Sequence, residues 1–412
     1  MSSDSNNDVL FDAFLKQLQE LDKFRITHIG RYRDSILDRD DPDIRRLIEA
    51  MAMFTARTHL MGERSIRRSH TRLFQQHFSY LLDPTPPMSL IQASTTPRFV
   101  DPKVIPVGTT VELEGKQPSS LKRTEEPALK LTCKTLTSLT LMPITLESVE
   151  TYRQKDQSYE LLLRFRADFA RLEPLETLQI HLNCYNDFRS SATVHFQLRE
   201  HLEKGRIEFQ PVGNATTGVE HVDCDITFDT LDIPEEDALL NRPLERSRSF
   251  FSFPQQKLFF NITPNSTPKK WSEFAVILKL APQWPAELKL SSDMFHLNVI
   301  PVANMVRDFS NPVLCDGTRE RYRLRSKSSD DTQEIMTIEG VYRTAANELH
   351  PLLPGVIEED DDCYEVEHEE IETRRQSWLY LQLKDALEEP QTVAIDAWWY
   401  SRQADDVDLL DW

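Results

Sequence analysis

The chain has 412 residues, of which 39% are hydrophobic and 28% are charged, and its formal net charge is -19. This length exceeds that of a usual single hydrophobic core, so about two to four domains are expected. The acidic balance argues against binding to nucleic acid or anionic lipid, because binding to phosphate depends on clustered Lys and Arg. Only 10 residues are glycine, which disfavours enzymes built on phosphate loops or nucleophile elbows.

The sequence contains no sign of a membrane span, a signal peptide or a cofactor site. No apolar stretch approaches the roughly 18 residues that cross a bilayer, and the Ser- and Asn-rich start lacks a basic segment followed by an apolar run. The five cysteines are widely spaced and form no CxxC pair, so neither a disulfide framework nor a structural zinc site is expected. We therefore expect a cytoplasmic protein without cofactor or metal.

The N-terminal region, residues 1–83, is predicted to be helical. Apolar residues recur at steps of three and four between Leu10 and Phe24, which places them on one side of a helix. A second helix is expected to begin at Pro42 behind Asp41 as N-cap. Gly62 is expected to interrupt it, before a third apolar stripe that stops ahead of residue 83.

Beyond residue 83 the pattern changes to period two with many β-branched residues, which is typical of strands. The sequence therefore predicts an α+β fold that is predominantly β, with two or three sandwich- or barrel-like domains after the helical region. The predicted units are 84–235, 249–326 and 327–412, and a Pro-containing charged segment separates the first two.

Four local patterns give more specific expectations. Alternation from Leu178 to Cys184 predicts a strand with one face on a core and the other in water. The spacing of His195, Leu198 and Leu202 favours a short helix. The Phe-rich segment 249–262 is predicted to be extended, and Gly108 to form a hairpin turn.

An acidic run extends from Glu358 to Glu372, with ten carboxylates in fifteen positions. Such a run repels itself, so a mobile loop at 358–372 is predicted. The spacing of the carboxylates does not match a calcium-binding EF-hand loop. His221 and Cys224 form an isolated pair without further zinc ligands nearby and are interpreted as ordinary strand residues. No pattern of catalytic residues is present, and an enzyme is not expected.

Several short segments, in a fixed order, resemble the TssF family of type VI secretion baseplate proteins. Together they cover most of the chain from Leu10 to about Tyr322. The segments are Asp41-Pro42-Asp43, Pro84-Thr85-Pro86-Pro87-Met88, Pro106-Val107-Gly108-Thr109, Phe253-Pro254 with Lys257-Leu258-Phe259-Phe260, and Phe295 to Asn304.

The resemblance implies a cytoplasmic scaffold protein, two copies of which pair with one TssG and join TssK and TssE around the VgrG hub. Such wedges template the assembly of the sheath and tube. Two alternatives remain open at this point. One is a wedge protein of a contractile phage tail or a phage-derived injection particle. The other, supported only by the abundance of Asp and Glu, is a carbohydrate-active β-sandwich enzyme.

A scaffold of this kind needs exposed apolar or basic surfaces that match a partner. Each candidate has a simpler interpretation, which is an intramolecular core for the helix stripe and the aromatic pair, and a solvated face for the arginines. The candidate interface residues are Phe11, Phe14, Leu18, Arg64, Arg67, Arg68, Arg72, Phe259 and Phe260.

Overall fold

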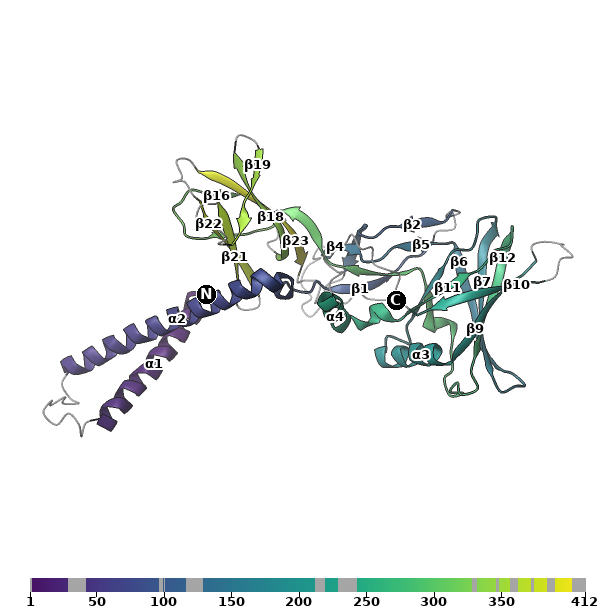
Figure 1. Ribbon diagram of the computed structural model, residues 1–412, viewed down its shortest axis with the longest axis horizontal. Coiled ribbons are helices and arrows are strands. Elements are labelled where there is room, and N and C mark those ends of the chain that lie inside the picture. The colour runs from purple at the N-terminus through teal and green to yellow at the C-terminus, as the bar shows by residue number, and fades with distance from the viewer. Residues whose placement is uncertain are drawn as a thin grey trace, which may run out of the picture. The chain divides into compact units, whose positions relative to one another are not determined.

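The computed structural model confirms an α+β fold that is predominantly β, with helices at the N-terminus (Figure 1). It consists of two compact units. Unit 1 comprises Met1–Asp83, Val313–Leu324 and Val341–Val393, and unit 2 comprises Pro84–Pro312, Arg325–Gly340 and Ala394–Trp412. The residues that the structure describes are 2–28, 42–95, 99, 101–115, 129–211, 219–228, 243–327, 332–345, 348–355, 362–371, 374–383 and 390–401.

Unit 1 begins with the helices α1, Ser2–His28, and α2, Pro42–Leu82 (Figure 1). The prediction that Gly62 interrupts the second helix is wrong, because α2 continues through it and departs from helical geometry only at Phe78. A single glycine costs about 1 kcal/mol in a helix but leaves the backbone hydrogen bonds intact. The predicted N-cap, Asp41, lies outside the described residues.

The remaining elements of unit 1 are short strands and one long β-hairpin. The strands β18, Gln333–Ala345, and β23, Gln391–Ser401, contribute residues to both units. In unit 1 a sheet has the order β17-β22-β21-β20. The strands of unit 1 are β16, Val313–Cys315; β17, Tyr322–Arg323; β19, Glu348–Pro351; β20, Leu353–Pro354; β21, Cys363–Ile371; and β22, Arg374–Gln382.

Most of the acidic run forms strand β21 rather than the predicted mobile loop, and residues 358–361 and 372 lie outside the described residues. Residues distant in sequence supply hydrogen-bond and ion-pair partners for its carboxylates. Arg321 Nη1 donates to Glu369 Oε1 at 2.6 Å, and its guanidinium lies 4.2 Å from the ring centroid of Trp378. Glu367 accepts a 2.7 Å hydrogen bond from the hydroxyl of Tyr380. Repulsion between its carboxylates therefore does not prevent this segment from forming a strand of the sheet.

Unit 2 is built on an eight-stranded sheet of order β13-β8-β11-β10-β9-β12-β7-β6, with a four-stranded sheet β1-β14-β4-β3 and a pair β2-β5. Its helices are α3, Phe188–His201; α4, Pro243–Ser252; and the 3-10 turns η1, Pro254–Lys257, and η2, Ser292–Met294. Its strands are β1, Met88–Gln92; β2, Lys103–Ile105; β3, Thr110–Gly115; β4, Leu129–Thr135; β5, Leu139–Leu141; β6, Ile144–Arg153; β7, Tyr159–Arg171; β8, Leu178–Leu182; β9, Leu202–Phe209; β10, Glu220–Thr227; β11, Phe259–Pro264; β12, Trp271–Leu280; β13, Phe295–Leu297; β14, Val299–Ala303; and β15, Val306–Phe309.

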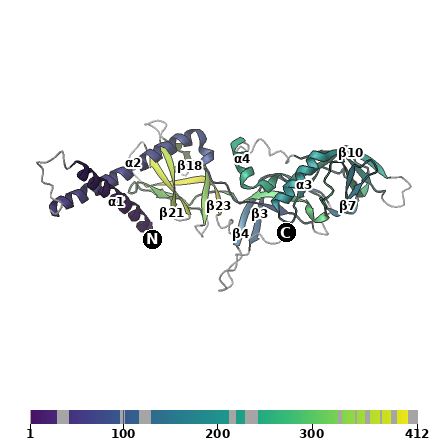
Figure 2. The same ribbon diagram turned by 90° about the horizontal axis from the view of Figure 1, so that it is seen from below.

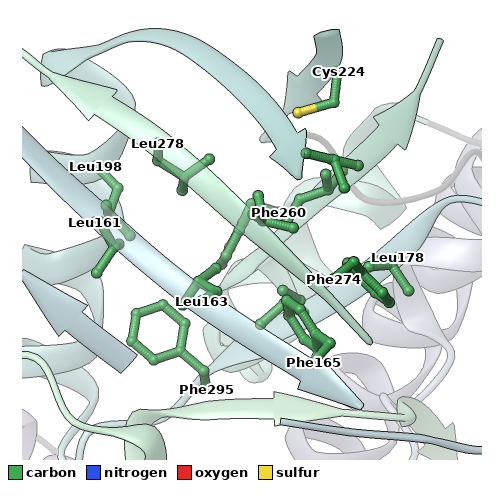
Figure 3. Packing of buried hydrophobic residues seen from close by; sticks show 14 of the residues in the cluster. Leu161, Leu163, Phe165, Leu178, Leu198, Cys224, Phe260, Phe274, Leu278 and Phe295 are labelled. Atoms are coloured by element: carbon green, nitrogen blue, oxygen red, sulfur yellow. The ribbon is translucent and has the colours of Figure 1, made fainter. Parts of the chain in front are cut away.

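The core of unit 2 lies on the inner face of the eight-stranded sheet (Figure 3). On β7, the alternate residues Leu161, Leu163 and Phe165 are at most 1% exposed, as the two-residue period of a strand requires. Phe165 stacks on Phe274 of β12, with ring centroids 5.1 Å apart. Leu198 of α3 joins the same cluster, so the helix covers part of this face.

Two predictions about unit 2 are wrong because sheet partners distant in sequence decide the outcome. The predicted boundary between 84–235 and 249–326 does not exist, since β10 and β11, on either side of it, pair within one sheet. Strand β8 has no face in water. Gln179 is 8% and His181 4% exposed, because the ring of His181 packs on Phe259, and Leu90, Val299 and Phe253 cover Phe259 on this second face.

Two further segments differ from the expectation in detail. Gly108, with φ of 76°, makes a turn, but the strands on either side of it pair with β5 and β4 and not with each other. The segment 249–262 is helical in α4 and η1 before it becomes extended in β11. The short helix predicted around His195 is confirmed as α3, which Asp187 caps by accepting from the backbone N–H groups of Arg189 and Ser190.

The two glycines Gly205 and Gly62 predict opposite effects of substitution by alanine. A Cβ on Gly205 would lie 2.5 Å from Ile226 Cδ1 and 2.8 Å from Cys224 Sγ, whereas one on Gly62 would meet nothing within 4 Å. We expect Gly205→Ala to lower the free energy of unfolding by about 1–3 kcal/mol through overpacking. Gly62→Ala is expected to leave it unchanged or raise it by about 1 kcal/mol. Urea unfolding of both variants measures these changes. Equal changes in the free energy of unfolding for the two variants would contradict the prediction.

Candidate partner interface

The helices α1 and α2 pack against each other as a hairpin in unit 1 (Figure 1, Figure 2). On α2 the side chains of Ala52 and Ala56, one turn apart, are 0% exposed. Small side chains at these positions let the two helix backbones approach closely. Because the helix period is 3.6 residues, the opposite side of α2 is left without cover from α1.

That opposite side of α2 carries an apolar stripe, which consists of Leu47, Met51, Phe54 and Met61. The steps of four, three and seven place these residues in one line along the helix. Their exposed fractions are 62%, 55%, 74% and 68%. Phe54 is an aromatic side chain of the kind that anchors protein interfaces. The stripe is therefore a surface that a partner could cover.

Three of the residues predicted for the interface, Phe11, Phe14 and Leu18, lie on one side of α1, and the ring centroids of Phe11 and Phe14 are 6.2 Å apart. Phe11 is 58% exposed, while Phe14 and Leu18 are half-buried. Since α2 is the neighbour of α1 in unit 1, we infer that Phe14 and Leu18 contribute to packing within the hairpin. Phe11 remains in the proposed interface. The residues of the α2 stripe are not among the predicted interface residues, although their helical spacing is visible in the sequence, because nothing in the sequence shows which face α1 covers.

The basic set lies on α2 but is only partly described. The side chain of Arg67 is exposed. Arg64, Arg68 and Arg72 belong to α2, and their side chains lie outside the described residues. Their role at an interface therefore stays a prediction.

Phe259 and Phe260, the last two candidates, are each 1% exposed in unit 2. The ring of Phe259 packs on His181, and that of Phe260 packs on Phe295 and Phe228. The structure therefore favours the core interpretation for this pair, and it leaves them out of the surface that a partner can reach.

A hollow of about 430 Å³ in unit 2 bears on the carbohydrate-active alternative. Among the residues that line it, Glu176 is the one carboxylate; the rest are apolar, hydroxyl or amide residues. Glycoside hydrolysis requires a pair of carboxyl groups facing the same bond. The hollow lacks this pair and gives the alternative no support.

The buried histidines and cysteines among the described residues bear on two further kinds of site, a metal site and a reactive thiol. Within the described ranges, no three His, Cys, Asp or Glu side chains gather closely enough to hold a metal ion. Burial raises the pKa of the Cys224 and Cys315 thiols to about 11, which keeps them protonated and unreactive at neutral pH. His221 and Cys224 both lie on strand β10.

Comparison with known proteins places these features in a family. A search of curated protein sequences gives no match. A chain in a solved structure of the TssK-TssF-TssG baseplate subcomplex of a type VI secretion system has a similar fold, with a TM-score of 0.67 and 19% identity, over 88% of this chain and 69% of that chain. A chain in a solved baseplate complex from the type VI secretion system gives a TM-score of 0.49 and 17% identity over 98% and 73% of the two chains.

The deciding observation is the family model of the type VI secretion system protein TssF, which matches residues 30–403. The chain belongs to the TssF family. The resemblance inferred from the ordered sequence segments is thereby confirmed. Helix α1 precedes the matched range, whereas the α2 stripe lies inside it. In the part of this TssF-family chain that the structure describes, no helix has the length and apolar character to cross a membrane.

Proposed function

We propose that this TssF-family chain is a structural wedge subunit of a type VI secretion baseplate and pairs with TssG through the hairpin of α1 and α2. The observation that carries the proposal is the α2 stripe of Leu47, Met51, Phe54 and Met61, which is exposed on the side facing away from the buried Ala52 and Ala56. Exposure of an apolar stripe of this length to water is unfavourable for the chain unless a partner covers it.

The proposed assembly includes further subunits. The similar solved structure is described as a subcomplex of TssK, TssF and TssG, which supports TssG and TssK as partners here. We further propose that a second copy of the chain joins the wedge, and that TssE and a VgrG hub complete the baseplate that templates the sheath and tube. The assembly would form in the cytoplasm, where the subunit acts as a scaffold without catalysing a reaction.

Substitution of Phe54 by glutamate tests the proposed pairing. A charge on the stripe would be buried without a partner on association, which costs several kcal/mol. We therefore expect Phe54→Glu to weaken binding to the cognate TssG by more than about tenfold. The measurement is co-elution in size-exclusion chromatography after co-expression, followed by titration of the purified proteins.

Leu172→Glu is the matched control, because Leu172 is an apolar side chain of unit 2 that is 73% exposed, against 74% for Phe54. It receives the same new charge at the same exposure, and it is expected to bind TssG like the parent chain. Full binding by Phe54→Glu, or an equal loss for both variants, would contradict a role of the α2 stripe in pairing.

A further inference from the structure

The hollow of about 430 Å³ in unit 2 is lined by a buried amide that lacks a hydrogen bond. Gln179 is 8% exposed, and its Oε1 has no hydrogen-bond partner. Such an amide is unfavourable for the folded chain, because water bonds it in the unfolded chain. The amide can turn about its last side-chain torsion, which exchanges the positions of its oxygen and nitrogen. Either end can therefore meet a group that enters the hollow.

The hollow also reaches an unpaired edge of strand β5. Leu139 and Thr140 are consecutive residues of β5, so their side chains point to opposite faces of the strand, yet both residues line the hollow. A space that meets both faces of a strand lies along its edge. Within the described residues, β5 pairs with β2 alone, and none of the lining residues belongs to β2. The edge at the hollow is therefore the one without a neighbouring strand.

The rest of the lining combines buried apolar side chains with exposed polar ones. Met142, Ile144 and Leu178 are 6%, 5% and 5% exposed and belong to the core of unit 2. Thr263 and Glu176 are exposed, and Glu176 is the one charged residue of the lining. Hydrogen bonds and apolar packing, more than charge, therefore decide what this hollow can bind.

An unpaired strand edge and an unbonded amide both match a peptide backbone. The edge presents N–H and C=O groups at the spacing of a strand, which an extended segment of another chain can pair with. A glutamine amide offers an N–H and a C=O side by side, as a peptide group does, so the two can bond to each other. A sugar matches neither pattern in this way. Because β5 has three residues, a short segment is sufficient.

We propose that the hollow binds a short extended segment of another protein, which adds a strand to β5 and pairs one of its peptide groups with the amide of Gln179. An apolar side chain of the segment packs on Met142 and Ile144, and its polar neighbours face the exposed side of the hollow. This site belongs to unit 2 and goes beyond the pairing proposed for the α2 stripe. The two proposals can therefore fail separately.

The test is a titration of the full chain, labelled at its Met and Ile methyl groups, with the capped peptide acetyl-Thr-Val-Thr-Val-Thr-amide. We expect saturable changes in the NMR shifts of the Met142 and Ile144 methyl groups. Ile207, which is buried in the same core but does not line the hollow, is the reference and keeps its shift. A peptide with N-methylated valines lacks two backbone N–H donors and is expected to bind at least about tenfold more weakly.

Gln179→Met gives a second readout that a merely structural role would not produce. It is expected to raise the thermal midpoint, because it removes a buried amide without a partner, and at the same time to weaken peptide binding by about tenfold. Gln283→Met is the matched control, since Gln283 is exposed and lies outside the lining, and it is expected to change neither quantity. Thr140→Trp fills the hollow and is expected to abolish binding.

Three results would overturn the proposal: a lower midpoint for Gln179→Met, equal binding of the two peptides, or full binding by Thr140→Trp. Shift changes at Met142 and Ile144 with maltose in place of the peptide would also overturn it and would identify a sugar site instead. Loss of peptide binding in Gln179→Met and Thr140→Trp, with full binding by Gln283→Met, would confirm the hollow as the peptide site.

Discussion

Replacing Phe274 with alanine is expected to lower the free energy of unfolding by about 3–5 kcal/mol. Phe274 is 2% exposed, and three other aromatic rings of unit 2 surround it. Its ring centroid lies 5.1 Å from that of Phe165, 5.5 Å from that of Trp271 and 5.6 Å from that of Phe209. Without the ring, the chain loses the free energy gained by transferring it from water into the core. A cavity also remains, because the hydrogen-bonded strands cannot move together to close it. Urea unfolding of the purified chain measures the effect.

Phe169→Ala on β7 is the matched control, because it is the same change at a side chain that is 52% exposed. It is expected to lower the free energy of unfolding by no more than about 0.5–1 kcal/mol, since a half-exposed ring buries little area and leaves no cavity. Similar losses for the two variants would mean that the aromatic cluster does not hold unit 2 together. A loss confined to Phe274→Ala would confirm the cluster as its core.

The local elements of this chain could be predicted from its sequence because each depends on near neighbours. The apolar steps on α1 and α2, the helical spacing around His195 and the alternation in β8 all follow from the period of a single element. The family-like segments were also readable, since they are short and ordered. These features were enough to predict the fold class correctly.

The sheet partners could not be predicted in this way. The burial of the second face of β8 depends on Phe259, which packs on His181, and on Leu90 and Val299, which pack on Phe259 and lie far from β8 along the chain. The acidic strand β21 depends on Arg321 and Tyr380, which no local pattern links to it. In each case the stabilising contact is with a residue distant in sequence. A short stretch of the sequence therefore does not reveal it.

The sequence predicts what type of surface forms the candidate interface, but not which residues form it. An exposed apolar helix face was expected in the N-terminal region, yet the choice between Phe14 on α1 and Phe54 on α2 rests on which faces pack together. Ala52 and Ala56 are the sequence signal for the packed face, because two small residues one turn apart permit close approach. The left-handed backbone at Tyr185 is indicated only weakly by the segment Asn183-Cys184-Tyr185-Asn186-Asp187, whose Asn and Asp residues are typical of turns.

His181 is expected to make the chain less stable in acid. Burial lowers its pKa from 6.5 to about 4, even though its Nε2 hydrogen-bonds the carbonyl of Gln255 at 3.3 Å. The nearby His195 and His296 also have lowered pKa values, chiefly through burial. Below pH 6.5 the unfolded chain takes up a proton at this position while the folded chain does not. The stabilising contribution of neutral His181 is therefore present at neutral pH and is lost as the pH falls from 6.5 towards 4.

The expected loss from this one histidine is about 2–3 kcal/mol between pH 7.5 and 4.5, because each pKa unit corresponds to about 1.4 kcal/mol. His181→Gln removes the titrating group and keeps an N–H that can donate to the carbonyl of Gln255. Urea unfolding of parent and variant at both pH values isolates the contribution: the parent should lose more stability than His181→Gln by this amount. If the two lose the same amount, the histidine either accepts a proton in the folded chain or is not buried, and the packing of β8 between β11 and β13 would be called into question.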